Sequence, residues 1–257
     1  MVHPLRRLGV TLVTPEIPGY THGSVSRSAR WQDWVSAATA SVEALVAASP
    51  GPCLLGGLCT GAVLALAVAA KHRLPSIRGL ALLSPLLSYD GWALPWWYRL
   101  RHLAYGLGLA DCFAMREQPP YGLKDERMRQ MVRRQMESEQ ATLVGPAQVS
   151  LRVIRESERL SNQVIPVLAD LALPVLALHA REDEICSLGS VQSALATISP
   201  GLLRTVVLEN SYHMITADND RQQVARELAT FCASALVPSR PLPTPGRWAR
   251  SEPTCEA

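Results

Sequence analysis

The chain lacks the signatures of several protein classes. Its six cysteines are scattered and form no Cys-x-x-Cys pair, which argues against a zinc site. Their spacing gives no disulfide framework either, so free thiols in a reducing cytosol are expected. Basic and acidic residues nearly balance, at 25 and 22, and no basic stripe carries interleaved aromatics, so no nucleic-acid partner is expected. No internal repeat is visible, and the first residues contain no continuous apolar core of a signal peptide.

A large apolar fraction is present in this chain of 257 residues. Hydrophobic residues make up 48% and charged residues 18%, so a sizeable core can form and global disorder is excluded. The uncharged run at residues 44–70 is long enough to span a bilayer. However, the Ser-Pro-Gly-Pro at 49–52 and the Gly-Gly at 56–57 interrupt it. Helix breakers at this density predict a helix, a turn, a strand and a second helix, and no membrane span.

Strand-like runs alternate with helix-like runs, the pattern of a parallel α/β sheet. The expected strands cover residues 10–17, 53–58, 77–84, 175–179 and 203–209, and the expected helices cover 31–48, 62–71, 187–198 and 220–233. No clear strand is visible at 86–170, where Met128, Met131, Val132 and Met136 follow helical spacing. We therefore expect an α/β core formed by residues 1–85 and 171–235, a helical insertion at 86–170, and a disordered tail at 236–257.

The motif G-L-C-T-G at residues 57–61 lies between an expected strand and an expected helix. It is a G-x-S-x-G nucleophile elbow with Cys59 in place of serine. A sharp strand-to-helix turn strains the backbone of the nucleophile, so its neighbours Gly57 and Gly61 are expected to be small for steric reasons. The N–H of Thr60 begins the helix and is expected to donate to a developing oxyanion. The dipole of the same helix favours a thiolate at Cys59.

Two further motifs follow, each after an expected strand. Asp183 lies in the segment after the strand at 175–179, and His213 lies after the strand at 203–209. The chain order is therefore nucleophile, acid, base. Glu182 and Glu184 flank Asp183 and are expected to be solvated. In this arrangement His213 takes the thiol proton of Cys59, and Asp183 orients His213.

These motifs resemble the α/β-hydrolase superfamily, most nearly its carboxylesterase and monoacylglycerol-lipase-like members with a serine aminopeptidase S33-type domain. The matching stretches are VTLVTPEIPGYTHG at 10–23, GGLCTGA at 56–62, LALHAREDE at 176–184 and ENSYHMITAD at 209–218. The resemblance covers residues 1–235. It implies a mostly parallel sheet flanked by helices, with the insertion as a helical lid. It also implies a small-molecule ester or thioester substrate and no metal or organic cofactor, and it leaves the oligomeric state open.

The N-terminal part departs from the family pattern. In such hydrolases a strand ending in His-Gly precedes the helix that leads into the strand expected at 10–17, and it supplies the second oxyanion N–H. Here residues 1–8 already resemble the end of that helix, so the N-terminal strands are expected to be missing. Unpaired backbone groups on the neighbouring strands would each cost on the order of 1–3 kcal/mol if buried. We hypothesise a start codon assigned too late or a truncated gene; an in-frame stop just before Met1 would contradict the late start.

The cysteine is the second departure. Related folds with a cysteine nucleophile include dienelactone hydrolases and polyhydroxyalkanoate synthases. A thiolate forms an acyl thioester, which stays activated for transfer to an amine, thiol or alcohol. The expected function is therefore hydrolysis or acyl transfer on a carboxylic ester or thioester through a Cys59-His213-Asp183 triad. The alternative is a catalytically silent homologue that binds a ligand or partner. Trp92, Trp96 and Trp97 form either an acyl-binding lid or the buried core of the insertion, because aromatics serve both.

Overall fold

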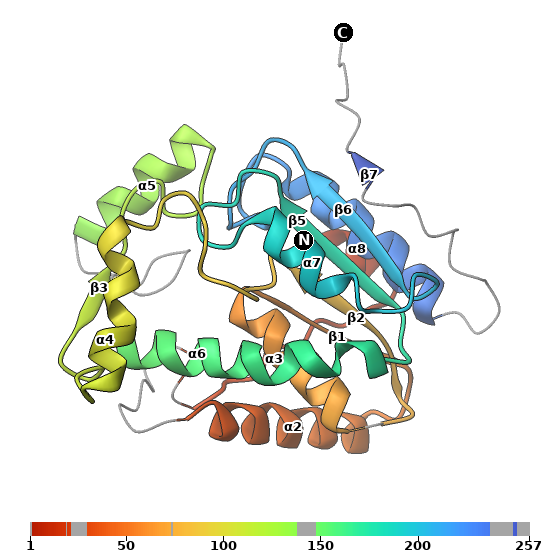
Figure 1. The fold of residues 1–257 in the computed structure, drawn as a ribbon. Helices are drawn as coiled ribbons and strands as arrows, with labels where there is room; N and C mark the ends of the chain where they lie inside the picture. Colours follow the sequence, from red (N-terminus) through yellow and green to blue (C-terminus); the bar gives the residue numbers. More distant parts are fainter. Residues whose placement is uncertain are drawn as a thin grey trace, which may run out of the picture.

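A computed structural model of the chain describes residues 2–18, 20–21, 30–72, 74–137, 148–236 and 249–250. These residues form a central sheet with helices on both faces (Figure 1). The strand order is β1-β2-β5-β6-β7, and every pair of neighbours is parallel. The strands are β1 Cys53–Leu58, β2 Ile77–Leu83, β5 Val175–Ala180, β6 Leu203–Leu208 and the two-residue β7 Ala249–Arg250. The expected parallel α/β architecture is confirmed.

The helices lie around this sheet and in the segment between β2 and β5 (Figure 1). They are α1 Val2–Arg7, α2 Trp31–Ala48, α3 Thr60–Lys71, α4 Arg101–Gly106, α5 Glu126–Glu137, α6 Leu151–Val164, α7 Leu188–Leu195 and α8 Arg221–Leu236, with 3-10 helices η1 Trp96–Leu100 and η2 Ile165–Asp170. α2, α3 and α6 lie together on one side of the sheet, and α8 covers the other side. Both layers are needed because the central strands carry apolar side chains on both faces.

The alternation of side chains along the strands divides the core into two clusters. Leu80 and Leu82 of β2 face the cluster that contains α2, α3 and α7. Their neighbours Ala81 and Leu83 face the opposite cluster, which contains Val224 and other residues of α8. Each face of the sheet is therefore buried, which fixes the register of the strands and holds their carboxyl ends at one edge.

The strand expected at residues 10–17 is wrong. Residues 10–17 belong to no helix and to no sheet, and the side chains of Leu12 and Val13 are about half exposed. A strand requires a hydrogen-bonded neighbour, and within the described ranges no residue pairs with this segment. β1 correspondingly lies at an edge of the sheet, with β2 as its one described neighbour. The apolar β-branched pattern alone could not predict this, because pairing depends on the rest of the sheet.

The segment at 86–170 contains η1, α4, α5, α6 and η2, and it is mainly helical as expected. The expectation of no strand there is wrong, because β3 Ala114–Arg116 and β4 Gln148–Ser150 pair as a short antiparallel sheet. Runs of three residues are too short to show a period in the sequence. The domain boundaries at 85, 170 and 235 stay predictions. The tail expected to be disordered at 236–257 lies, apart from residues 236 and 249–250, outside the described residues.

The apolar run at 44–70 is divided as expected. α2 ends at Ala48, β1 begins at Cys53, and α3 begins at Thr60. Within the described part of the chain, no helix has both the length and the apolar character that crossing a membrane requires.

Candidate active site

The nucleophile elbow is formed by the junction of β1 and α3. Cys59 occupies the single position between them, with φ of 60° and ψ of −129°, a conformation that L residues rarely adopt. Its N–H donates to the carbonyl oxygen of Leu83 at 3.0 Å, which ties the turn to the end of β2. The thiol is consequently held at the carboxyl edge of the sheet, at the N-terminus of a helix.

The two elbow glycines differ in their surroundings. A Cβ added at Gly57 would lie 2.2 Å from the carbonyl carbon of Gly61, so no side chain fits there. A Cβ added at Gly61 would meet no described atom within 4 Å. The steric reason given for two small residues therefore applies to Gly57, and the described residues give no such reason for Gly61.

The expected base and acid are in contact. Nδ1 of His213 lies 2.8 Å from Oδ2 of Asp183, and both residues are only 2% exposed. The other carboxylate oxygen, Oδ1, accepts from the backbone N–H groups of Ile185 and Cys186 at 3.0 and 2.9 Å. Nε2 of His213 is buried and makes no hydrogen bond to a described residue. Asp183 is thus fixed by its own loop and in turn fixes the imidazole.

Cys59 is close enough to His213 for its charge to affect the pKa of the imidazole. Burial alone would lower the pKa of His213, but the negative charges of Asp183 and of a Cys59 thiolate outweigh it and hold that pKa well above its ordinary value. Burial would likewise raise the pKa of Asp183, but the charge and hydrogen bond of His213 lower it below its usual range. The contact between His213 and Asp183 therefore moves their two pKa values in opposite directions, up for the imidazole and down for the carboxyl.

Glu184 is placed differently from the prediction. We expected it to be solvated, but it is 3% exposed and its Oε2 accepts from the backbone N–H of His213 at 3.0 Å. Burial raises the pKa of Glu184 to about 7, with Asp183 adding to the rise and His213 opposing it. The sequence could not reveal this, because the hydrogen bond joins two loops that are 29 residues apart. Glu182, by contrast, is exposed as expected and pairs with Lys124 at 2.9 Å.

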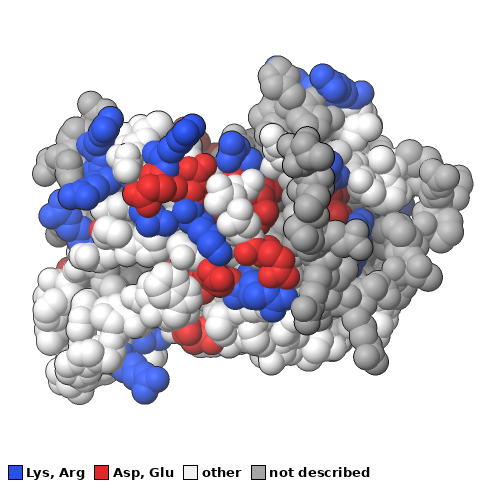
Figure 2. Space-filling view, turned by 90° about the horizontal axis from the view of Figure 1, so that it is seen from above, with Lys and Arg blue, Asp and Glu red and all other residues white. Residues whose placement is uncertain are grey.

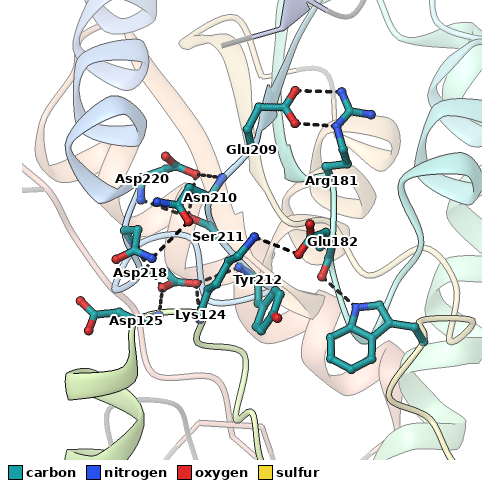
Figure 3. Close-up of polar contacts among 12 residues, drawn as sticks. Lys124, Asp125, Arg181, Glu182, Glu209, Asn210, Ser211, Tyr212, Asp218 and Asp220 are labelled. Atoms are coloured by element: carbon teal, nitrogen blue, oxygen red, sulfur yellow. Dashed lines mark hydrogen bonds and ion pairs between the residues drawn. The ribbon is translucent and has the colours of Figure 1, made fainter. Parts of the chain in front are cut away.

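A network of polar contacts braces the acid loop and the histidine loop (Figure 3). The fully buried Asp218 accepts from four backbone N–H groups: those of Lys124, Asp125, Tyr212 and Asn219, all within 2.9 Å. This carboxylate therefore joins the insertion to the loop that carries His213. Figure 3 also shows Arg181 at the end of β5 facing Glu209 at the end of β6. On the face drawn in Figure 2, acidic side chains lie beside basic ones.

The three tryptophans lie on the surface. Trp96 and Trp97 are 80% and 48% exposed, so the interpretation of the cluster as a buried core is wrong for them. Neither lines the described cavities of about 460 and 710 Å³. Trp92 donates from Nε1 to the carbonyl oxygen of Glu182 at 3.0 Å, and its ring packs edge-on against Tyr212. Trp92 thus contacts both loops of the site, while an acyl-binding role for the three residues stays a prediction.

The sequence did not reveal two tyrosines beside Cys59. Burial raises the pKa of both Tyr20 and Tyr89, and the charge of the neighbouring Cys59 raises it further. The Thr60 hydroxyl is 2.8 Å from Oγ of Ser157 on α6, which places the insertion directly against the elbow. These contacts span long distances in the chain, so no local pattern could predict them.

His179 and Cys186 are buried next to Asp183. Nε2 of His179 lies 2.8 Å from the carbonyl oxygen of Cys186, and both side chains are fully buried. Burial lowers the pKa of His179 despite the nearby Asp183, and burial raises the pKa of Cys186 to about 12. A neutral histidine and an un-ionised thiol fit the packing roles expected for them.

Comparison with known proteins identifies the family. Residues 18–220 match the family model described as serine aminopeptidase, S33. The chain therefore belongs to this family of α/β-hydrolases, and membership supports hydrolase activity. Whereas the family is named for a serine enzyme, the elbow of this chain carries Cys59.

Solved structures share the fold at low identity. A monoacylglycerol lipase of Paleococcus ferrophilus has 15% identity and a TM-score of 0.66, covering 85% of this chain and 81% of that one. A structure from a study of two metagenome-derived lipolytic enzymes has 18% identity and a TM-score of 0.71, covering 90% and 85%. A monoglyceride lipase variant of Saccharomyces cerevisiae has 14% identity and a TM-score of 0.69, covering 86% and 76%. No curated protein matches.

Proposed function

We propose that this chain hydrolyses or transfers the acyl group of a carboxylic ester or thioester, with Cys59 as nucleophile. The observation that carries the proposal is the state of His213. Its Nδ1 is held by Asp183 at 2.8 Å, and its Nε2 has no hydrogen-bond partner among the described residues and lies next to Cys59. A buried imidazole with one nitrogen oriented by a carboxylate and the other facing a thiol is the arrangement that takes up and returns the proton of a nucleophile.

The proposed reaction proceeds in two acyl transfers. Sγ of Cys59 attacks the carbonyl carbon, and the thiol proton is held by Nε2 of His213. The new oxyanion accepts from the N–H of Thr60, which has no intrahelical partner because it lies in the first turn of α3. The carbon–oxygen or carbon–sulfur bond to the leaving group then breaks, and His213 returns the proton to that group. Water or another nucleophile attacks the acyl thioester while His213 accepts its proton. The carbon–sulfur bond to Cys59 then breaks, and His213 returns the proton to Sγ, which restores the thiol.

The substrate class follows from the neighbours of the family and from the thiol. The similar structures include a monoacylglycerol lipase, a monoglyceride lipase and a thermophilic esterase, which supports an ester as substrate. A thioester intermediate keeps the acyl group activated, which favours transfer to an amine, thiol or alcohol beside hydrolysis. The five described cysteines are free thiols, which supports the proposed cytosolic location.

Hydrolysis of 4-nitrophenyl pentanoate tests the proposal. We expect Cys59→Ala to lose at least about 10³-fold in kcat, because the covalent route is removed. Cys112→Ala is the matched control, since Cys112 is an exposed thiol of the insertion, and it should keep the wild-type rate. Full activity in Cys59→Ala would contradict the proposal. A wild-type protein without turnover, with a Cys59 thiol that titrates near the ordinary value of about 8.5, would favour the silent ligand-binding homologue instead.

A further inference from the structure

A polar cavity lies between the start of the insertion and α6. Its volume is about 460 Å³, which fits a small-molecule ligand. α4 forms one wall with Arg101 and Tyr105, and α6 forms the other with Arg155 and Arg159. The known motifs of the family do not account for these residues, and none of them belongs to the triad.

The cavity is positively charged, because three arginines line it against one glutamate. Arg101 is engaged: its Nε and Nη2 donate to Oε1 of Glu158 at 2.9 and 2.7 Å. Arg159 is engaged as well, donating from Nη1 to Oε1 of the buried Glu156 at 2.7 Å. Arg155 differs from both. Its guanidinium lies over the ring of Tyr105, 5.5 Å from the centroid, and it makes no hydrogen bond or ion pair to a described residue.

Arg155 therefore presents unused donors to the cavity. A guanidinium carries five N–H donors in a planar fork that matches the two oxygens of a carboxylate or phosphate. The ring of Tyr105 holds one face of this fork, which reduces the entropy lost when an anion binds. Charge and free donors together indicate an oxyanion as the ligand.

The cavity is also adjacent to the nucleophile. Leu86 and Tyr89 line it, and the N–H of Leu86 lies 3.4 Å from the carbonyl oxygen of Cys59. Tyr89 is near enough to Cys59 for the thiolate charge to raise the pKa of its hydroxyl. Leu86 and Tyr89 therefore both line the cavity and border the elbow.

We propose that this cavity binds the oxyanion of a substrate whose acyl group reaches Cys59, with Arg155 as its specificity-determining residue. The preferred substrates are then esters or thioesters that carry a carboxylate or a phosphate, and neutral acyl glycerides are poor ones. This inference rests on the proposed function of Cys59. It goes beyond it by assigning the charge of the substrate.

A pair of esters of equal chain length tests the charge preference. We compare the mono-4-nitrophenyl ester of glutaric acid with 4-nitrophenyl pentanoate, in the wild type, in Arg155→Gln and in Arg127→Gln. Arg127 is an exposed arginine of α5 and serves as the matched loss of one charge. We expect the wild type to favour the glutarate ester. Arg155→Gln should lower kcat/KM for that ester by about 10-fold or more and leave pentanoate within about 2-fold, because a charge-assisted hydrogen bond is lost. Arg127→Gln should alter neither.

An equal loss for both esters in Arg155→Gln, or a wild type that does not distinguish them, would overturn the inference. A binding measurement that needs no catalysis distinguishes a failure of this inference from a failure of the proposed function. The melting temperature of the wild type should rise with free glutarate or inorganic phosphate, and Arg155→Gln should show no rise. The anion that raises it more identifies the carboxylate or the phosphate. No rise with either anion would overturn the inference even if 4-nitrophenyl pentanoate is hydrolysed.

Discussion

The buried Glu184 should make folding stability depend on pH in a specific direction. Its pKa is about 7 in the folded protein, against the ordinary value of 4.5 for an exposed glutamate. Below about pH 4.5 the group is protonated in both states, and its effect on stability is constant. As the pH rises from there to 7, the unfolded chain releases the proton while the folded protein keeps it, so the free energy of unfolding falls. The shift of about 2.5 units corresponds to about 3 kcal/mol.

Glu184→Gln removes this titration and keeps a hydrogen-bond acceptor for the N–H of His213. Between pH 5 and pH 8 we expect the wild type to lose about 2–3 kcal/mol of its free energy of unfolding relative to the variant. Urea denaturation followed by tryptophan fluorescence at several pH values measures it. Asp183 and His213 also face this carboxyl and titrate, but both remain in the variant. Parallel pH profiles for the two proteins would refute the assignment of a buried, protonated Glu184.

Three further perturbations test particular contacts. Gly57→Ala should prevent folding or lower the free energy of unfolding by more than about 3 kcal/mol, because its Cβ would lie 2.2 Å from Gly61. Gly61→Ala should keep the free energy of unfolding within about 1 kcal/mol of the wild type. Thermal melts of the two variants measure this, and equal melting temperatures would contradict it. Asp218→Ala leaves four backbone N–H groups without their acceptor. It should therefore lower the free energy of unfolding, measured by urea titration, by at least about 3 kcal/mol. A loss below about 1 kcal/mol would show that Asp218 does not hold these loops together. Asp183→Asn should reduce kcat by about 10³-fold or more, since the imidazole loses its orientation; a rate within about 10-fold of wild type would exclude Asp183 as the acid.

Much of the fold was predictable because its signals are local. The helix at Trp31–Ala48 and the strand at Cys53–Leu58 agree in their bounds with the sequence expectation, since apolar periodicity and Gly-Pro breakers mark both ends. The segment at 10–17 has the same composition as a strand and is none, because strand formation depends on a partner that the described residues do not provide. The three-residue strands β3 and β4 are too short to carry a pattern.

The residues of the site were likewise predictable only where their signal is local. Asp183 and His213 were predicted from their positions after two strands, and they meet because parallel strands bring their carboxyl ends to one edge. Glu184, Tyr20 and Tyr89 could not be found, since their roles depend on burial and on contacts between distant segments. Gly61 shows the opposite error, because a motif residue was given a steric reason that its surroundings do not require.

The most direct test of the central claim is the intact mass of the protein after a brief incubation with 4-nitrophenyl pentanoate. We expect one pentanoyl adduct on the wild type, carried on Cys59, and none on Cys59→Ala. An adduct of the same stoichiometry on Cys59→Ala would show that another residue takes the acyl group, and it would contradict the assignment of Cys59 as the nucleophile.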